Sequence, residues 1–127
     1  MVSILGGSKG PLDKSARTRV DSAMREAEIA TRLEFSVYVG DLEGDDTRAA
    51  ARELHGRLRA PSRSVLICAS PQQRVLEIVT GERADDRLSD GELDRIGEEM
   101  GQCFERGDLV GGLVHGLGSI SQSCQRG

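Results

Sequence analysis

The sequence predicts an α/β fold, a three-layer sandwich in which helices cover both faces of a central mixed sheet of about four strands. Apolar residues at helical spacing predict the helices. The continuous apolar run at 64–69 is typical of a strand covered on both faces, as in parallel pairing. The short polar turn at 70–73 forces the following strand to run antiparallel. The expected order is (β)αβαββαα, with a right-handed crossover between parallel strands.

The chain is expected to open with a short edge strand over residues 2–5. Glycines and a proline at 6–11 then interrupt regular structure. Asp13 is expected to cap a helix that runs to about Arg32, with one face rich in small residues.

A strand and a second helix follow. Alternation of apolar and polar residues at 35–39 predicts the strand, and the acidic loop 40–46 comes next. Asp46 is then expected to cap a helix over 47–58.

The hairpin identified above consists of strands at 64–69 and 75–79, and Gly81 ends the second strand. Ser89 with Glu92 three residues later forms a capping box, which predicts the start of the third helix.

The third helix is expected to end at Gly107, after which Asp108 caps a last helix over 109–120. The glycines of this helix suit close packing of its backbone. The core of a single domain then spans about residues 12–120, and the tail 121–127 is expected to be frayed.

Composition argues against several classes of function. The chain has no Trp, one Tyr and two Phe, so it lacks aromatic platforms for single-stranded nucleic acid. A net charge of −4 disfavours binding to a phosphate backbone. No stretch reaches the ~18 apolar residues of a membrane span, and the N-terminus lacks a signal-peptide pattern. We therefore expect a cytoplasmic protein without a nucleic-acid partner. The three widely spaced cysteines match no zinc or disulfide framework.

The order of elements, together with a block of short motifs, resembles the TPM domain family. The block has an aliphatic strand, a polar turn ending in arginine, a strand that exits at glycine, a Leu-x-Asp before a helix and a Phe-x-x-Gly-Asp break. These motifs are Val65–Ala69, Ser70–Arg74, Val75–Gly81, Leu88 with Asp90 and Ile96, and Phe104 with Gly107, Asp108 and Leu109. Members of that family include a thylakoid acid phosphatase, a photosystem II repair factor and many bacterial proteins of unknown role.

Two features depart from the family pattern. The usual Gly-Tyr-Gly-like exit is replaced by Gly81, Glu82 and Arg83, and the segment 54–63 lacks a Trp-x-x-Gly-like motif. Many members of the family are anchored in a membrane, whereas no span is present here. The resemblance therefore implies a divergent, soluble bacterial branch of that family.

An acidic loop is the first candidate site. Its four carboxylates follow a parallel strand, at the sheet end where α/β folds tend to bind ligands. Oxygen ligands at this density suit Ca²⁺ or Mg²⁺, which would polarise a phosphate oxygen or prepare a water molecule for attack. The alternative is a solvated loop that only caps a helix. The residues are Asp41, Glu43, Asp45 and Asp46.

A second acidic cluster at 85–92 is expected at the opposite end of the sheet, because the hairpin returns the chain there. The two acidic clusters should therefore not build one site. Nearby arginines are interpreted either as salt-bridge partners of this cluster or as the lining of an anion pocket. The arginines are Arg57, Arg59, Arg63 and Arg83.

Other polar residues have structural interpretations. Arg74 beside the hairpin turn is expected to stabilise that turn, the alternatives being a pair with the acidic loop or contact with an anion. His55 and His115 have no partner at a spacing suited to acid–base catalysis, so both are interpreted as structural or surface residues. Cys68 is expected to be buried and inert, and Cys124 to be exposed in the tail.

Two main hypotheses for function stay open. The first is a non-catalytic module that binds a protein partner, with its oligomeric state undetermined. The second is an acid phosphatase assisted by a divalent metal at Asp41, Asp45 and Asp46, although no nucleophilic aspartate is identified. A third option is an adaptor that presents an apolar surface on residues 109–120.

Overall fold

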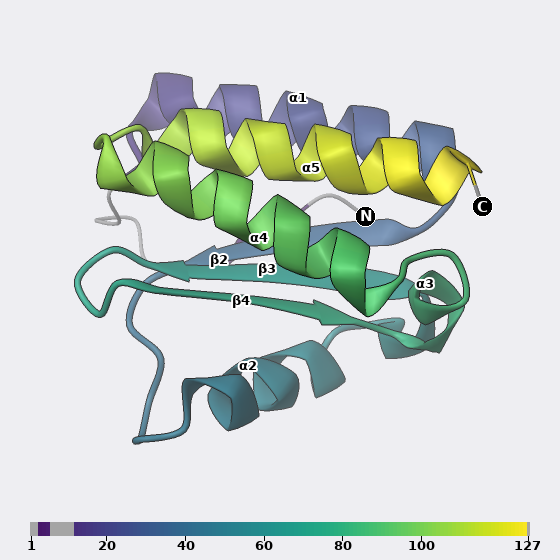
Figure 1. Cartoon of the computed structure of the whole chain (residues 1–127), viewed down its shortest axis with the longest axis horizontal. Coiled ribbons are helices and arrows are strands. Elements are labelled where there is room, and N and C mark those ends of the chain that lie inside the picture. The colour runs from purple at the N-terminus through teal and green to yellow at the C-terminus, as the bar shows by residue number, and fades with distance from the viewer. Residues whose placement is uncertain (1–2, 6–11, 127) are drawn as a thin grey trace.

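The computed structural model describes residues 3–5 and 12–126 (Figure 1). Val2 and the predicted interruption at 6–11 lie outside the described residues. The elements in chain order are β1 (Ser3–Leu5), α1 (Lys14–Thr31), β2 (Glu34–Val39), α2 (Thr47–Gly56), the 3-10 turn η1 (Pro61–Arg63), β3 (Ser64–Ser70), β4 (Val75–Thr80), α3 (Glu82–Asp85), α4 (Asp90–Glu105) and α5 (Leu109–Arg126).

The strands form a mixed sheet in the order β1-β2-β3-β4. The pairs β1–β2 and β2–β3 are parallel, whereas β3–β4 is the antiparallel hairpin. Strands β2 to β4 make up its continuous part, and the three-residue β1 adds to one edge. Every residue of β3 is buried, which agrees with its uninterrupted apolar sequence.

Helices cover both faces of the sheet. Figure 1 shows α1, α4 and α5 on one face and α2 on the other. The larger core cluster lies on the three-helix side and includes Phe35, Ile67 and Met100. A smaller cluster lies under α2 and includes Leu66 and Cys68. The predicted mixed α/β fold is thus confirmed.

Side chains cap the long helices at the predicted positions. Asp13 accepts a hydrogen bond from the N–H of Ala16 at the start of α1. The carboxylate of Asp46 does the same for α2. Ser89 and Glu92 form the reciprocal capping box of α4. Because each cap satisfies N–H groups that a helix start leaves free, these short polar signals located the helix starts well.

The C-terminal end differs from the prediction. Helix α5 continues past Ile120 to Arg126, so the tail is not frayed within the described residues. Ser121 and Ser123 are buried, and Cys124 is 1% exposed, which corrects its expected exposure. Polar composition made the segment look like a solvated tail, but Cys124 belongs to the same buried cluster as Met24 and Ala27 of α1.

Two further expectations are corrected. Four residues of the expected loop after Gly81 form the short helix α3. The apolar side of α5 is not an available adaptor surface, because Leu113, Leu117 and Ile120 are completely buried. None of the helices within 3–5 and 12–126 combines the length and apolar character needed to cross a lipid bilayer.

Candidate functional site

The sheet separates two polar regions. In the register of β3 and β4, Ser70 pairs with Val75 at one end, and Val65 pairs with Thr80 at the other. The acidic loop 40–46 therefore lies at the hairpin-turn end, and α3 lies at the opposite end. The predicted separation of the two acidic clusters is present in the structure.

The acidic loop is held mainly by its neighbours. Gln73 in the hairpin turn accepts a hydrogen bond from the N–H of Leu42 at 2.8 Å and donates one to its carbonyl at 2.9 Å. Asp41 accepts a bond from the Ser70 hydroxyl at 3.2 Å. The Leu42 side chain is buried in the small apolar cluster with Ala51 and Leu66. Burial of one leucine and a two-bond clamp thus explain how the loop is ordered.

The four carboxylates of this loop do not converge. Glu43 and Asp45 are exposed, and Asp46 is engaged at the start of α2. Within the described part of the chain, no group of three or more His, Cys, Asp or Glu side chains has the arrangement of a metal site. This geometry agrees with the alternative of a solvated loop that carries a helix cap.

Three of the four predicted arginines form ion pairs. Arg57 pairs with Glu53 one turn earlier on α2. Arg59 and Arg63 both bind Glu34, at 3.2 and 3.0 Å. Burial raises the pKa of Glu34, but hydrogen bonds led by that from Arg59 outweigh it, so the pKa lies below its ordinary value.

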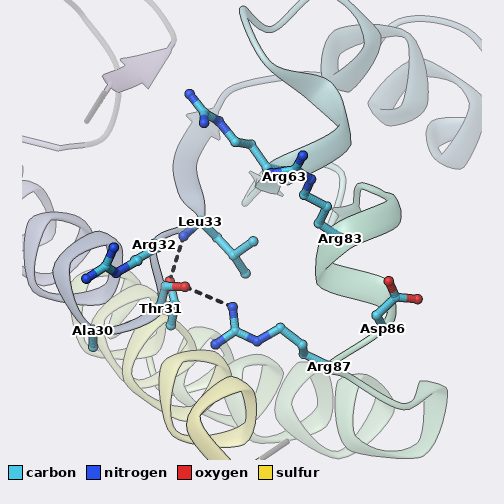
Figure 2. Close-up of a pocket in the computed structure, with 8 residues that line it drawn as sticks. All are labelled: Ala30, Thr31, Arg32, Leu33, Arg63, Arg83, Asp86 and Arg87. Atoms are coloured by element: carbon cyan, nitrogen blue, oxygen red, sulfur yellow. Dashed lines mark hydrogen bonds between the residues drawn. The ribbon is translucent and has the colours of Figure 1, made fainter.

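The fourth predicted arginine, Arg83, lines a cavity of about 600 Å³. We call this cavity the arginine pocket, and Figure 2 shows its lining. The end of α1 forms one side of it, and η1 and α3 contribute the others. Its lining residues are Ala30, Thr31, Arg32, Leu33, Arg63, Arg83, Asp86 and Arg87.

The side chain of Arg87 extends toward the end of α1, and Figure 2 shows its bond to Thr31. Its Nη1 donates to the carbonyl of Thr31 at 2.8 Å, and its Nε and Nη2 donate to that of Cys124 at 3.3 and 3.1 Å. These carbonyls belong to the last turns of α1 and α5, where helix dipoles favour a cation. Both partners are neutral groups, so no carboxylate cancels the charge of Arg87 through these bonds.

Arg32 occupies the position after α1 in a left-handed conformation, with φ 64°. This conformation is costly for a side chain that is not glycine. Within the described residues, no side-chain hydrogen bond or ion pair joins Arg32, Arg83 or Asp86 to another group. The pocket is thus lined by four arginines and one aspartate, and only Arg63 has a carboxylate partner.

This surplus of positive charge suits an anion. A guanidinium presents parallel N–H donors that match a carboxylate or a phosphate. The surplus is local, since the chain has a net charge of −4. Sequence reasoning predicted Arg63 and Arg83 but missed Arg32 and Arg87. The available signals were weak: Arg32 follows a helix, and Arg87 precedes the Leu88–Ser89 helix start.

The two histidines and Arg74 make contacts that stabilise the fold or lie on the surface. His55 is buried and lies 3.0 Å from the carbonyl of Ser64, which joins α2 to β3. His115 contacts Glu99 on the surface at 2.8 Å. Arg74 closes the hairpin turn with φ 56°, and its main-chain N–H donates to Pro71. No side-chain bond links Arg74 to the acidic loop among the described residues.

Gly81 has a steric role beside the pocket. A Cβ at this position would overlap the main-chain carbonyls of Pro61 and Ser62. Absence of a side chain therefore lets the start of α3 lie directly on η1. This contact sets Arg83 near Arg63, so the predicted glycine exit of β4 shapes the arginine pocket.

The chain is similar to a family of proteins and to several solved structures. A family model described as "Domain of unknown function (DUF5130)" matches residues 6–121. Uncharacterized protein Rv2468c of Mycobacterium tuberculosis strain H37Rv is 32% identical over 108 residues, 85% of this chain. Uncharacterized protein MT2543 of strain CDC 1551 matches equally well. The chain spans 64% of the length of each of these relatives.

Solved structures share the fold at low sequence identity. The NMR structure of BA42 from Bizionia argentinensis has a TM-score of 0.84 at 20% identity, covering 94% of this chain and 86% of that one. The N-terminal domain of cg2496 from Corynebacterium glutamicum has a TM-score of 0.74 at 18% identity, covering 96% and 78%. At these identities the likeness concerns the fold alone.

Proposed function

Since the chain belongs to the family described as a domain of unknown function (DUF5130), we propose a function for it from its arginine pocket. The domain is a non-catalytic interaction module that binds an acidic segment of a partner protein. A carboxylate of that segment enters the arginine pocket. The resemblance to the TPM domain family is part of this proposal, as a likeness of scaffold and not of phosphatase activity.

The observation that carries the proposal is a cavity whose arginines exceed its carboxylates. Among the residues that the structure describes, Arg32 and Arg83 contact no carboxylate, and Arg87 donates only to main-chain carbonyls. Three arginines with no carboxylate partner within 3–5 and 12–126 therefore belong to the lining of one cavity, with Asp86 as the acidic lining residue. An anion in this cavity would be attracted by these charges and could accept hydrogen bonds from their N–H groups.

The proposal that the domain is non-catalytic is supported by the side chains that line the described pocket, which form no reactive arrangement. Arginine stays protonated in proteins and serves poorly as a general base. Within the described residues, the pocket lining has no His, Cys, Ser or Lys, and its single hydroxyl is that of Thr31. This hydroxyl donates to the carbonyl of Ala27 at 2.7 Å and accepts from the N–H of Leu33. It is thus fully engaged by main-chain groups.

The test is a titration of the isotope-labelled protein with a capped hexaglutamate peptide, followed by NMR. We expect amide shifts at Arg32, Arg83 and Arg87 that saturate. Arg83→Gln should weaken binding about three- to tenfold, because it removes one charge-assisted hydrogen bond. Arg52→Gln, an exposed arginine on α2, is the matched control and should bind like the parent.

A second variant separates binding from folding. Arg32→Gly removes a pocket charge and also relieves the left-handed strain at this position, so the protein should become slightly more stable. Weaker binding by this variant cannot then be attributed to unfolding. Equal affinities of the parent, Arg83→Gln and Arg32→Gly would contradict the proposal.

Two further arms distinguish other outcomes. Inorganic phosphate tests whether the pocket accepts any small anion, and tighter binding of phosphate than of the peptide would overturn the protein-partner assignment. A phosphomonoester assay with Mg²⁺ tests the phosphatase hypothesis. Turnover in the parent that is lost in Asp45→Asn would overturn the non-catalytic assignment.

A further inference from the structure

The outer edge of β4 has main-chain groups that its neighbour β3 does not use. The N–H of Gly81 donates to the carbonyl of Ser64, which makes this a hydrogen-bonded pair of the antiparallel ladder. Such pairs alternate along a ladder. The main-chain groups of Leu76, Ile78 and Thr80 therefore point away from β3. No strand lies beyond β4 in the sheet of the described residues.

A separate contact confirms that the main-chain groups of Ile78 point away from β3. Arg48 on α2 reaches over the edge, and its Nη1 donates to the carbonyl of Ile78 at 2.7 Å. The side chain of Arg48 is 44% exposed and also forms an ion pair with Glu77. The other outward groups of Leu76 and Thr80 have no such cover among the described residues.

The edge lies in a groove of about 540 Å³ between α2 and α4. Leu76, Ile78 and Leu93 give it an apolar floor on the α4 side. Gly97 brings α4 close to this floor, with its Cβ position 3.9 Å from Leu76. The groove thus combines unpaired strand donors and acceptors with apolar contact area.

The charge of the groove selects its occupant. Arg48 is neutralised by Glu77, whereas Asp90 and Asp94 on α4 are exposed and have no ion pair with another described residue. Two copies that paired through β4 would place these aspartates of both copies on the same face of a shared sheet. Like charges disfavour that arrangement, while a basic peptide complements it.

We propose that the β4 edge binds an extended peptide of another protein as an added strand, and that a Lys or Arg of this peptide pairs with Asp90 and Asp94. Strand addition of this kind uses main-chain hydrogen bonds for affinity and side-chain contacts for specificity. The site is distinct from the arginine pocket, and neither depends on the other.

The probe is the capped heptapeptide Thr-Val-Thr-Lys-Thr-Val-Thr, whose Val-Lys-Val face matches the apolar floor and the aspartates. NMR should show shifts and slowed amide exchange at Leu76, Ile78 and Thr80. Replacing the lysine of the probe with glutamate should weaken binding at least about fivefold. The double variant Asp90→Asn/Asp94→Asn should weaken binding of the lysine probe by a similar factor.

Two controls make the test specific. Glu98→Gln/Asp45→Asn changes the net charge equally at exposed positions outside the groove and should bind like the parent. Two N-methylated probes test the main-chain hydrogen bonds. One carries N-methyl groups on the odd-numbered residues of the peptide, and the other carries them on the even-numbered residues. One of these patterns should abolish binding and the other should be tolerated, because only one set of N–H groups faces β4.

Equal binding of both N-methylated probes would overturn strand addition. Absence of shifts at Leu76, Ile78 and Thr80 would overturn the site. The parent protein could instead fail to bind the probe and show a molecular mass that rises with protein concentration, with β4 in the contact between copies. That result would overturn the peptide as the occupant in favour of a second copy of this chain.

Discussion

At the residue scale, the carboxylate of Glu34, at the start of β2, pairs with two arginines. Its side chain is 13% exposed and accepts bonds from Arg59 and Arg63. Glu34 also holds Arg63 at one wall of the pocket, whereas Arg32 and Arg83 have no carboxylate partner within the described ranges. Glu34 thus neutralises Arg63 and leaves the charges of the other pocket arginines uncompensated by its carboxylate.

Glu34 should make stability depend on pH in the acid range. Its folded pKa lies below the ordinary 4.5, so its contribution is full above about 4.5 and is lost as pH falls through the lowered value. Glu34→Gln should lower the free energy of unfolding at pH 7 by up to about 1 kcal/mol. It should also make stability less sensitive to acid, as measured by urea unfolding across this range.

The control for this prediction is Glu43→Gln in the exposed acidic loop. This variant should lose stability in acid as steeply as the parent. An acid profile of Glu34→Gln that superimposes on that of the parent would refute the role assigned to the two arginines.

At the element scale, glycines set how closely helices approach their neighbours. The start of α3 lies on η1 through Gly81, and α5 packs on α4 through Gly112 and Gly116, where a Cβ would overlap Phe104 and Met100. The glycines of the last helix were expected to allow close packing of its backbone, and the contacts at Gly112 and Gly116 confirm this. Gly118, in contrast, faces open space.

Replacing these glycines by alanine should therefore change stability in opposite directions. Gly81→Ala forces a Cβ into two main-chain carbonyls, so it should lower the free energy of unfolding by about 2–3 kcal/mol. Gly118→Ala at an exposed helix position should raise it by up to about 1 kcal/mol. Urea unfolding of both variants checks this prediction, and similar losses in both would contradict it.

At the scale of the whole molecule, the last turns of α5 join segments that are distant in the sequence. The last turns of α5 bury Ser121, Ser123 and Cys124, and the carbonyl of Cys124 receives two bonds from Arg87. Arg87 in turn holds the end of α1 through Thr31. The arginine pocket is thus built by segments that are far apart in the sequence.

Truncation tests this arrangement directly. A chain that ends at Ile120 should lose roughly 2–4 kcal/mol of unfolding free energy, because it gives up a buried cysteine and the bonds of Arg87. It should also bind hexaglutamate more weakly. A chain that ends at Gln125 keeps these contacts and should match the full chain in thermal and urea unfolding. Equal stability of both truncations would instead support a frayed tail.

Local rules predicted most of the fold and only part of the candidate site. Caps such as Asp13 and Ser89 act over three residues, and a four-residue turn leaves one possible strand direction, so these features were visible in the sequence. The partners of Arg87 lie 56 and 37 positions away. No periodicity reports such contacts, which is why the pocket arginines Arg32 and Arg87 were missed.

The bonds from Arg87 to the carbonyl of Cys124 also hold in place the last turn of α5, in which the Cys124 thiol is buried. Burial raises the pKa of Cys124, so both access and ionisation restrain its reaction with alkylating or oxidising reagents. Modification then requires the last turn to open and release Arg87. The rate of thiol trapping at Cys124 therefore measures how often this end of the molecule opens, and an anion that engages Arg87 would alter that rate.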